Sequence, residues 1–190
     1  LKSVFNNALS DFSNVTLLNF SEISETGDVT GHLRIGTTSA EKGAFAILPY
    51  PGVPLAGDMW FNHPSDFYNW ELAIRNGSYW NAAFTHEIGH ALGLAHTQEQ
   101  EDLAGTAYGL DLTVGSINNA KPYSIMSYFE YVGETNQVAN NLYSGPVGIS
   151  INDIKALQYL YGVNEQHNSG DTVYTLDSIM GNTLSKSYFN

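Results

Sequence analysis

The sequence contains no cysteine, and this absence excludes disulfide bonds, thiol nucleophiles and cysteine-ligated metal sites. Basic residues are scarce as well: seven Lys and Arg stand against 19 Asp and Glu, so the formal net charge is -12. Such a charge repels phosphate backbones and anionic lipid, so we expect no nucleic-acid partner. No apolar run approaches the roughly 20 residues that cross a bilayer, so we also expect no membrane insertion.

The residues that are present fit a folded domain. The chain has 190 residues, of which 43% are hydrophobic and 13% aromatic. A chain of this size can bury a core, which excludes intrinsic disorder as a general description. The start at Leu1 has neither an initiator Met nor a signal-peptide core, so we expect a mature form or an excised fragment. The lack of thiols is also typical of bacterial secreted proteins.

Apolar periodicity predicts three helices. Residues Lys2–Phe12 form one amphipathic helix, and a second runs from about Ser78 to near Gly93. A capping-box pattern at Ser150–Asp153 begins a third helix, which ends at Gly162. The second helix is identified by a stripe of apolar residues: Trp80, Phe84, Ile88 and Ala91.

Between the first two helices, short apolar or alternating segments separated by turn residues predict strands of one sheet. The stretch Thr97–Gly148 has no sustained period and is expected to be loop-dominated. The order of elements therefore predicts an α+β fold with a sheet-containing half and a loop-rich half. The expected strands are Val15–Phe20, His32–Thr38, Ala44–Leu48 and Asp58–Asn62.

The residues that indicate chemistry lie in the run His86–His96. His86 and His90 are four residues apart, so their imidazoles project from one helix face and can hold one ion at about 2.0 to 2.1 Å. Gly93 can take the left-handed conformation that ends a helix, which brings His96 round as a third ligand. Three neutral imidazoles leave zinc one open position for a water whose pKa falls to about 7.

Glu87 lies about 100° further round the predicted helix, beside the metal, where it can take the proton of that water. The pattern H-E-x-x-H arises by chance about 0.01 times in a chain of this composition. Histidines without metal and a purely structural zinc site are the alternative interpretations. A structural site normally closes with a fourth protein ligand, usually Cys, which this chain lacks.

The run Thr85–His96 resembles the elongated zinc motif of the metzincin metalloendopeptidases, and Ser124–Tyr128 resembles their Met-turn. Three further segments are similar, in order and spacing, to segments of serralysin-type bacterial proteases: Gly43–Pro49, Gly57–Asn62 and Asp153–Gly162. The resemblance covers about Phe5 to Tyr174. Thr97 departs from the serralysin pattern, in which Pro typically follows the third histidine.

This resemblance implies one catalytic domain over residues 1–190 with two lobes. Residues 1–96 would form an N-terminal lobe with a mixed twisted sheet and the active-site helix. Residues 97–166 would form a loop-rich C-terminal lobe with one helix and the Met-turn, and the substrate would lie in a cleft between the lobes. The tail 167–190 resembles the lead-in to a calcium-binding β-roll whose repeats do not follow.

The resemblance also assigns roles outside the zinc run. Met126 would form a hydrophobic floor beneath the histidines, and ordinary core packing is its alternative. Tyr128 would be an additional zinc ligand at rest and would donate a hydrogen bond to the tetrahedral intermediate; a packed aromatic is its alternative. Ala44, Phe45 and Ala46 would pair with the substrate as an edge strand, unless this strand lies inside the sheet.

Other polar residues are kept out of the predicted site. Calcium is a second candidate cofactor, with no position assigned; Glu99, Glu101 and Asp102 are candidate carboxylates, although a solvated acidic surface explains them as well. Three histidines lie far from the zinc run in sequence and are expected to be exposed or hydrogen-bonded: His32, His63 and His167.

The sequence thus predicts a secreted bacterial endopeptidase with one catalytic Zn²⁺, which hydrolyses peptide bonds in extended protein or peptide substrates. Glu87 is the expected general base and acid. The chain is expected to be a monomer, and a proteinaceous inhibitor is a candidate partner. Two alternatives stay open: a catalytically silent peptide-binding domain of the same fold, and a processing protease with one narrow target.

Overall fold

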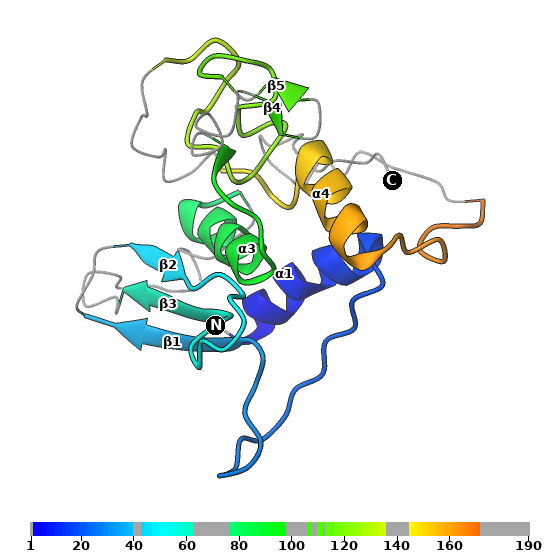
Figure 1. Cartoon of the computed structure of the whole chain (residues 1–190). Coiled ribbons are helices and arrows are strands. Elements are labelled where there is room, and N and C mark those ends of the chain that lie inside the picture. Colours follow the sequence, from blue (N-terminus) through cyan, green and yellow to red (C-terminus); the bar gives the residue numbers. More distant parts are fainter. Residues whose placement is uncertain are drawn as a thin grey trace.

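The computed structural model describes residues 2–39, 43–62, 77–97, 106–107, 110–111, 113–135 and 145–171. Within these ranges the chain forms three helices, a small sheet and a two-stranded ribbon (Figure 1). The elements are, in chain order, α1 (Lys2–Val15), β1 (Arg34–Thr38), β2 (Ala44–Ala46), β3 (Asp58–Asn62), α3 (Tyr79–Ala91), β4 (Thr106–Ala107), β5 (Leu110–Asp111) and α4 (Ile151–Tyr161).

The described sheet is mixed and has the strand order β1-β3-β2. β1 runs parallel to β3, with Gly36 opposite Trp60, and β2 runs antiparallel to β3, with Phe45 opposite the same Trp60. β2 therefore lies at one edge of the described sheet, on the side toward α3 (Figure 1).

The core lies where the sheet, α1, α3 and α4 meet. Alternate residues of β3 face inward, so that Met59 and Phe61 are fully buried, and the Phe61 ring stacks on Phe84 of α3 with 4.2 Å between centroids. Phe12 of α1 and Leu157 of α4 are also fully buried. Burying one such side chain contributes about 1.5 to 3 kcal/mol, so this cluster fixes α3 against the sheet and the other two helices.

The α+β class and the mixed sheet agree with the sequence prediction. The described parts of Thr97–Gly148 hold only the two-residue strands β4 and β5, as the lack of a sustained period predicted. No helix in the described ranges has the length and the apolar run that crossing a bilayer requires.

The strand predicted at Val15–Phe20 is wrong. Helix α1 continues to Val15, three residues beyond its predicted end, and the Thr16 hydroxyl then donates to the carbonyl of Phe12 at 2.7 Å. Thr16 makes a single bridge with Val163, and no ladder follows. Leu18 and Phe20 pack on the core from an irregular backbone, and this packing explains their presence without a strand.

Candidate metal centre

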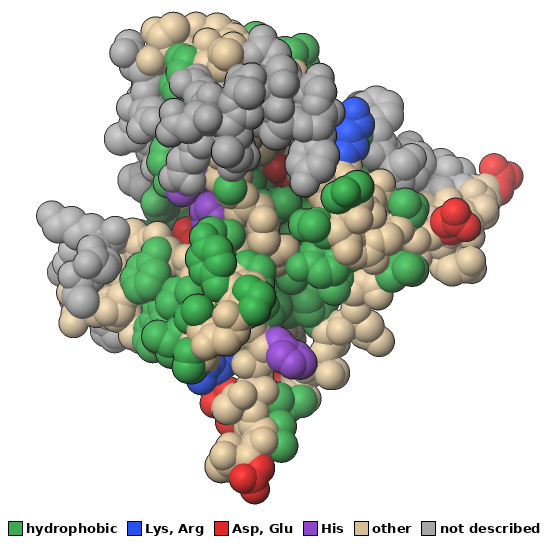
Figure 2. Space-filling view, in the orientation of Figure 1, with side chains coloured by type: hydrophobic (Ala, Val, Ile, Leu, Met, Phe, Trp, Pro, Cys, Tyr) green, Lys and Arg blue, Asp and Glu red, His purple; other side chains and the backbone are tan. Residues whose placement is uncertain are grey.

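Helix α3 holds the first two histidines of the predicted site. The helix begins where the Ser78 hydroxyl accepts the backbone N–H of Asn81 at 3.1 Å. Its stripe of apolar residues is buried against the core, as the sequence predicted, and His86 and His90 lie on another part of its surface. In Figure 2, histidine side chains are visible at the upper edge of the sheet-bearing part of the molecule.

The chain reverses immediately after α3. Gly93 has φ +97°, its N–H donates to the carbonyl of His90 at 2.9 Å, and the N–H of Leu94 donates to the carbonyl of Gly89 at 2.9 Å. These two hydrogen bonds form a Schellman motif, for which a glycine in the left-handed region is the usual residue. The reversal brings His96 back toward the helix, as the sequence predicted from Gly93.

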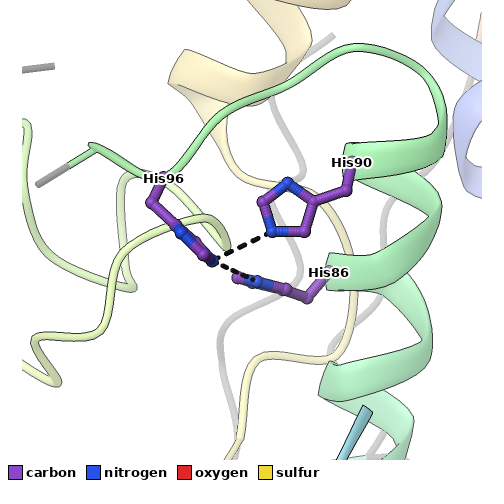
Figure 3. A group of neighbouring side chains, drawn as sticks. All are labelled: His86, His90 and His96. Atoms are coloured by element: carbon purple, nitrogen blue, oxygen red, sulfur yellow. Dashed lines mark hydrogen bonds between the residues drawn. The ribbon is translucent and has the colours of Figure 1, made fainter. Parts of the chain in front are cut away.

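The three histidine rings converge on one point (Figure 3). His96 Nε2 lies 3.1 Å from His86 Nε2 and 2.9 Å from His90 Nε2. Two nitrogens bound to one ion at about 2.05 Å in a tetrahedral arrangement lie about 3.3 Å apart, which is close to these separations. Within the described residues, His86, His90 and His96 form the one group of side chains that could hold a metal ion.

Hydrogen bonds at Nδ1 of His86 and His90 show which ring nitrogens can bind a metal ion. His86 Nδ1 lies 2.9 Å from the carbonyl oxygen of Ile125, and His90 Nδ1 lies 2.7 Å from that of Leu94. Carbonyl oxygens only accept, so each Nδ1 carries the proton and each neutral ring presents a lone pair at Nε2. Two lone pairs therefore point at His96 Nε2, an arrangement that a shared cation stabilises. The donor set fits zinc.

The charge state of the rings supports the same conclusion. Burial, the largest cause, together with the neighbouring His90 lowers the pKa of His86 from 6.5 to about 3. His86 is therefore neutral at physiological pH, which is the state in which an imidazole nitrogen binds a metal.

Glu87 lies beside this group and is only 5% exposed. Burial raises the pKa of its carboxyl group to about 8. Its Oε2 atom is buried and has no hydrogen-bond partner among the described residues. A buried, unpartnered carboxyl oxygen costs free energy, and it is a common feature of groups that act on a bound molecule.

The segment Ser124–Tyr128 lies against α3. Met126 is 2% exposed, and a Cβ atom placed on Gly89 would lie only 2.7 Å from its sulfur. The Met126 side chain can therefore approach the helix this closely only because residue 89 is a glycine, which has no side chain. Tyr128, by contrast, is 39% exposed, and its hydroxyl lies 2.8 Å from His96 Nε2.

Asp153, in the first turn of α4, holds this segment in place. Its carboxylate accepts hydrogen bonds from the Ser124 hydroxyl at 2.6 Å and from the Ile125 N–H at 2.8 Å. It also accepts the N–H of Ser150 at 2.9 Å, as expected for the predicted capping box. Because the Ile125 carbonyl contacts His86, a chain of hydrogen bonds connects α4 to a predicted metal ligand.

The remaining predicted residues lie as follows. Ala44, Phe45 and Ala46 form β2 at the edge of the described sheet, and Phe45 is 39% exposed. Outside the metal group, His32 is exposed and His167 contacts Asn168, so neither joins the site, as the sequence predicted. The predictions for four residues lie outside the described ranges: His63, Glu99, Glu101 and Asp102.

Several contributors to the site were not predicted. The carbonyl groups of Leu94 and Ile125 carry no sequence signal, because every residue has a carbonyl. Asp153 was predicted only as a helix-capping residue, and its second set of contacts connects segments far apart in the chain. Asn119, which is fully buried between the segments that follow His96 and Met126, was not singled out.

Comparison with known proteins places these residues in a family context. The matrixin family matches residues 1–119. Metalloprotease AprA of Pseudomonas entomophila (strain L48) is 34% identical over 177 residues, which cover 90% of this chain and 35% of that protein. Serralysin B of Dickeya chrysanthemi is 33% identical over 179 residues, again with 90% of this chain and 35% of the relative covered.

A third relative, metallopeptidase AprA of Pseudomonas marginalis, is 35% identical over 182 residues, which cover 92% of this chain and 36% of that protein. The chain thus spans about a third of the length of the curated relatives that it matches.

Proposed function

The chain belongs to the matrixin family and is a serralysin-like metzincin, and from this premise we propose that it is a secreted zinc-dependent endopeptidase. Its substrates are extended protein or peptide segments. The observation that carries the proposal is the convergence of the three histidines: His96 Nε2 lies 3.1 Å from His86 Nε2 and 2.9 Å from His90 Nε2.

These three histidines would hold the zinc ion, and Tyr128 would be an additional ligand at rest. The ion, when bound, polarises the substrate carbonyl and lowers the pKa of a water molecule to about 7. The hydrogen bonds from His86 to Ile125 and from His90 to Leu94 orient the two rings and keep their Nε2 lone pairs directed at the metal.

Glu87 moves the proton. Its carboxylate takes one proton from the attacking water, whose oxygen bonds to the carbonyl carbon of the scissile peptide. Glu87 then passes this proton to the leaving amine nitrogen as the C–N bond breaks. Its buried Oε2, which accepts no hydrogen bond from the described residues, is the atom that can hold this proton.

Tyr128 and β2 act on the substrate. The exposed Tyr128 hydroxyl leaves His96 and donates a hydrogen bond to the carbonyl oxygen as negative charge develops there, a contribution of about 2 to 4 kcal/mol. Ala44, Phe45 and Ala46 pair with the substrate backbone in antiparallel fashion along the sheet edge. Met126 supports the histidines from below through its contact with Gly89.

We assign these parts to one catalytic domain. Residues 1–96 supply the sheet and the active-site helix, residues 97–166 supply the Met-turn and α4, and the sequence of residues 167–190 resembles the lead-in to a β-roll. Peptide hydrolysis by the folded chain, with and without a chelator, tests the activity itself.

The variant Glu87→Gln tests the role of the base. It should keep zinc at the wild-type stoichiometry and lose at least about 10²-fold in kcat, because the amide cannot accept the proton. Glu134→Gln is the matched control, since Glu134 is 4% exposed and lies outside the proposed machinery. Near-normal hydrolysis by Glu87→Gln would remove Glu87 from this role, and a folded zinc-loaded protein that cleaves nothing would favour a binding domain.

A further inference from the structure

Two buried hydroxyl groups outside the metal group donate to the same buried acceptor, the side-chain oxygen of Asn119. Asn119 Oδ1 accepts hydrogen bonds from the Thr97 hydroxyl at 2.5 Å and from the Ser127 hydroxyl at 2.9 Å. Asn119 is fully buried, Ser127 is 1% exposed and Thr97 is 7% exposed. We call this arrangement the Asn119 bridge.

The bridge connects the segment that carries His96 to the segment that carries Tyr128. Thr97 directly follows His96, and Ser127 directly precedes Tyr128. On the other side of these segments, the Tyr128 hydroxyl lies 2.8 Å from His96 Nε2. The two segments are thus joined once through the buried bridge and once through the pair of side chains that face the metal position.

The bridge is itself anchored on both sides. The Ser127 hydroxyl accepts the N–H of Phe129 at 3.1 Å, and the N–H of Asn119 donates to the carbonyl of Ser116 at 3.2 Å. Removal of the shared acceptor would break two buried hydrogen bonds, and such a loss is costly in a protein interior. The bridge therefore favours one separation of the two segments.

Tyr128 needs such a constraint more than the histidines do. Its side chain is 39% exposed and follows an irregular segment, whereas His86 and His90 are fixed by the rigid helix α3 and by hydrogen bonds at Nδ1. His96 lies on the irregular segment after the helix. The relative position of His96 and Tyr128 is thus the part of the site that the helix does not determine.

We propose that Asn119 is a positioning residue that, through Thr97 and Ser127, sets the distance between His96 and Tyr128. By doing so it determines how firmly these two residues, together with His86 and His90, hold the metal ion. The consequence for metal rests on the proposed function, whereas the positioning itself is a property of the metal-free protein. Thr97 stands where the serralysin pattern has Pro, and proline has no hydroxyl that could join such a bridge.

The positioning is tested first without metal, by nuclear Overhauser effects between the Tyr128 and His96 rings, whose centroids lie 4.5 Å apart. Thr97→Val removes the donor and keeps the side-chain volume, and Thr97→Ser restores a hydroxyl. The matched control is Thr16→Val, because Thr16 is 1% exposed and its hydroxyl donates to the Phe12 carbonyl at the far end of α1.

The ring-to-ring signal should weaken in Thr97→Val and persist in the wild type, in Thr97→Ser and in Thr16→Val. An unchanged signal in folded Thr97→Val would overturn the proposal. If Thr97→Val does not fold, Ser127→Ala removes the second donor from the other side of the bridge, and the same two outcomes decide the question.

Metal binding provides the second readout. Zinc affinity, measured by competition with a chromophoric chelator, should fall about tenfold in Asn119→Ala, as is typical when a residue that orients a metal ligand is lost. The fall should be smaller in the Tyr128→Phe background, since the hydroxyl that the bridge positions is then missing. Equal losses in both backgrounds would contradict a role through Tyr128.

Neither readout uses peptide hydrolysis. A protein that passes both tests and cleaves no peptide would refute the proposed activity and leave the bridge intact. A protein that cleaves peptides through the three-histidine site but keeps its ring-to-ring signal and zinc affinity in the variants would refute the bridge alone.

Discussion

The buried carboxyl group of Asp153 gives the folded chain a pH dependence that can be isolated by one substitution. Asp153 is 3% exposed and accepts three hydrogen bonds, from Ser124, Ile125 and Ser150. Burial, the largest cause, raises its pKa from 3.8 to about 6, and the three hydrogen bonds only partly oppose this rise. Asp153→Asn removes the titration and keeps an oxygen for the two backbone donors, while the Ser124 hydroxyl can accept from the new amide.

The size of this change in unfolding free energy follows from the difference between the pKa of Asp153 in the folded chain and its pKa in the unfolded chain. Below about pH 3.8 the carboxyl group is protonated in both the folded and the unfolded chain. Between this value and about 6, the folded chain keeps a proton that the unfolded chain releases, so stability falls as pH rises. The difference is 6 - 3.8 = 2.2 units, which at about 1.4 kcal/mol per unit corresponds to about 3 kcal/mol lost by pH 7.

The assay is urea unfolding of the wild type and of Asp153→Asn between about pH 4 and 7.5, in excess chelator. Contributions of the histidines are common to both proteins and cancel in the difference. The free energy of unfolding of the wild type, minus that of the variant, should fall by about 2.5 kcal/mol as pH rises through this range, since about 0.5 kcal/mol of the total is already lost at pH 4. Asp28→Asn, at an exposed position, controls for the change of charge. A flat difference, or one that rises with pH, would refute the reasoning.

Three further predictions concern the metal position. Gly89→Ala should weaken zinc affinity about tenfold in chelator competition, because the new Cβ displaces Met126; unchanged affinity would show that the methionine moves freely. Tyr128→Phe should lower kcat on a peptide substrate by about 10² to 10³ and change KM little, and a loss confined to KM would argue against transition-state stabilisation. Removal of zinc by a chelator should lower the free energy of unfolding by about 4 kcal/mol relative to zinc at a thousand times its Kd, and equal melting curves would contradict metal binding to the folded chain.

The parts of the fold that the sequence predicted well are those fixed by local chemistry. The limits of α3 follow from the Ser78 cap and from Gly93, and β3 was predicted with its observed bounds. The convergence of the three histidines follows from a spacing of four on a helix and from a glycine that lets the chain turn back. These features depend on neighbours within about ten residues, so one sequence is enough to predict them.

The parts that could not be predicted depend on distant segments. In place of the strand expected at Val15–Phe20, helix α1 ends at Val15 and an irregular segment follows, because a short apolar run packs equally well in several conformations. Asp153 and Asn119 reach residues 22 to 29 positions away, and their partners are backbone groups or common hydroxyls. No spacing rule identifies such contacts before the chain is folded.

Anomalous diffraction at the zinc absorption edge, on crystals grown with saturating zinc, tests the account most directly. We predict one strong peak within about 2.0 to 2.1 Å of the Nε2 atoms of His86, His90 and His96. An empty position between these three rings, or a zinc ion held by other residues, would contradict our proposal that this protein is a zinc endopeptidase.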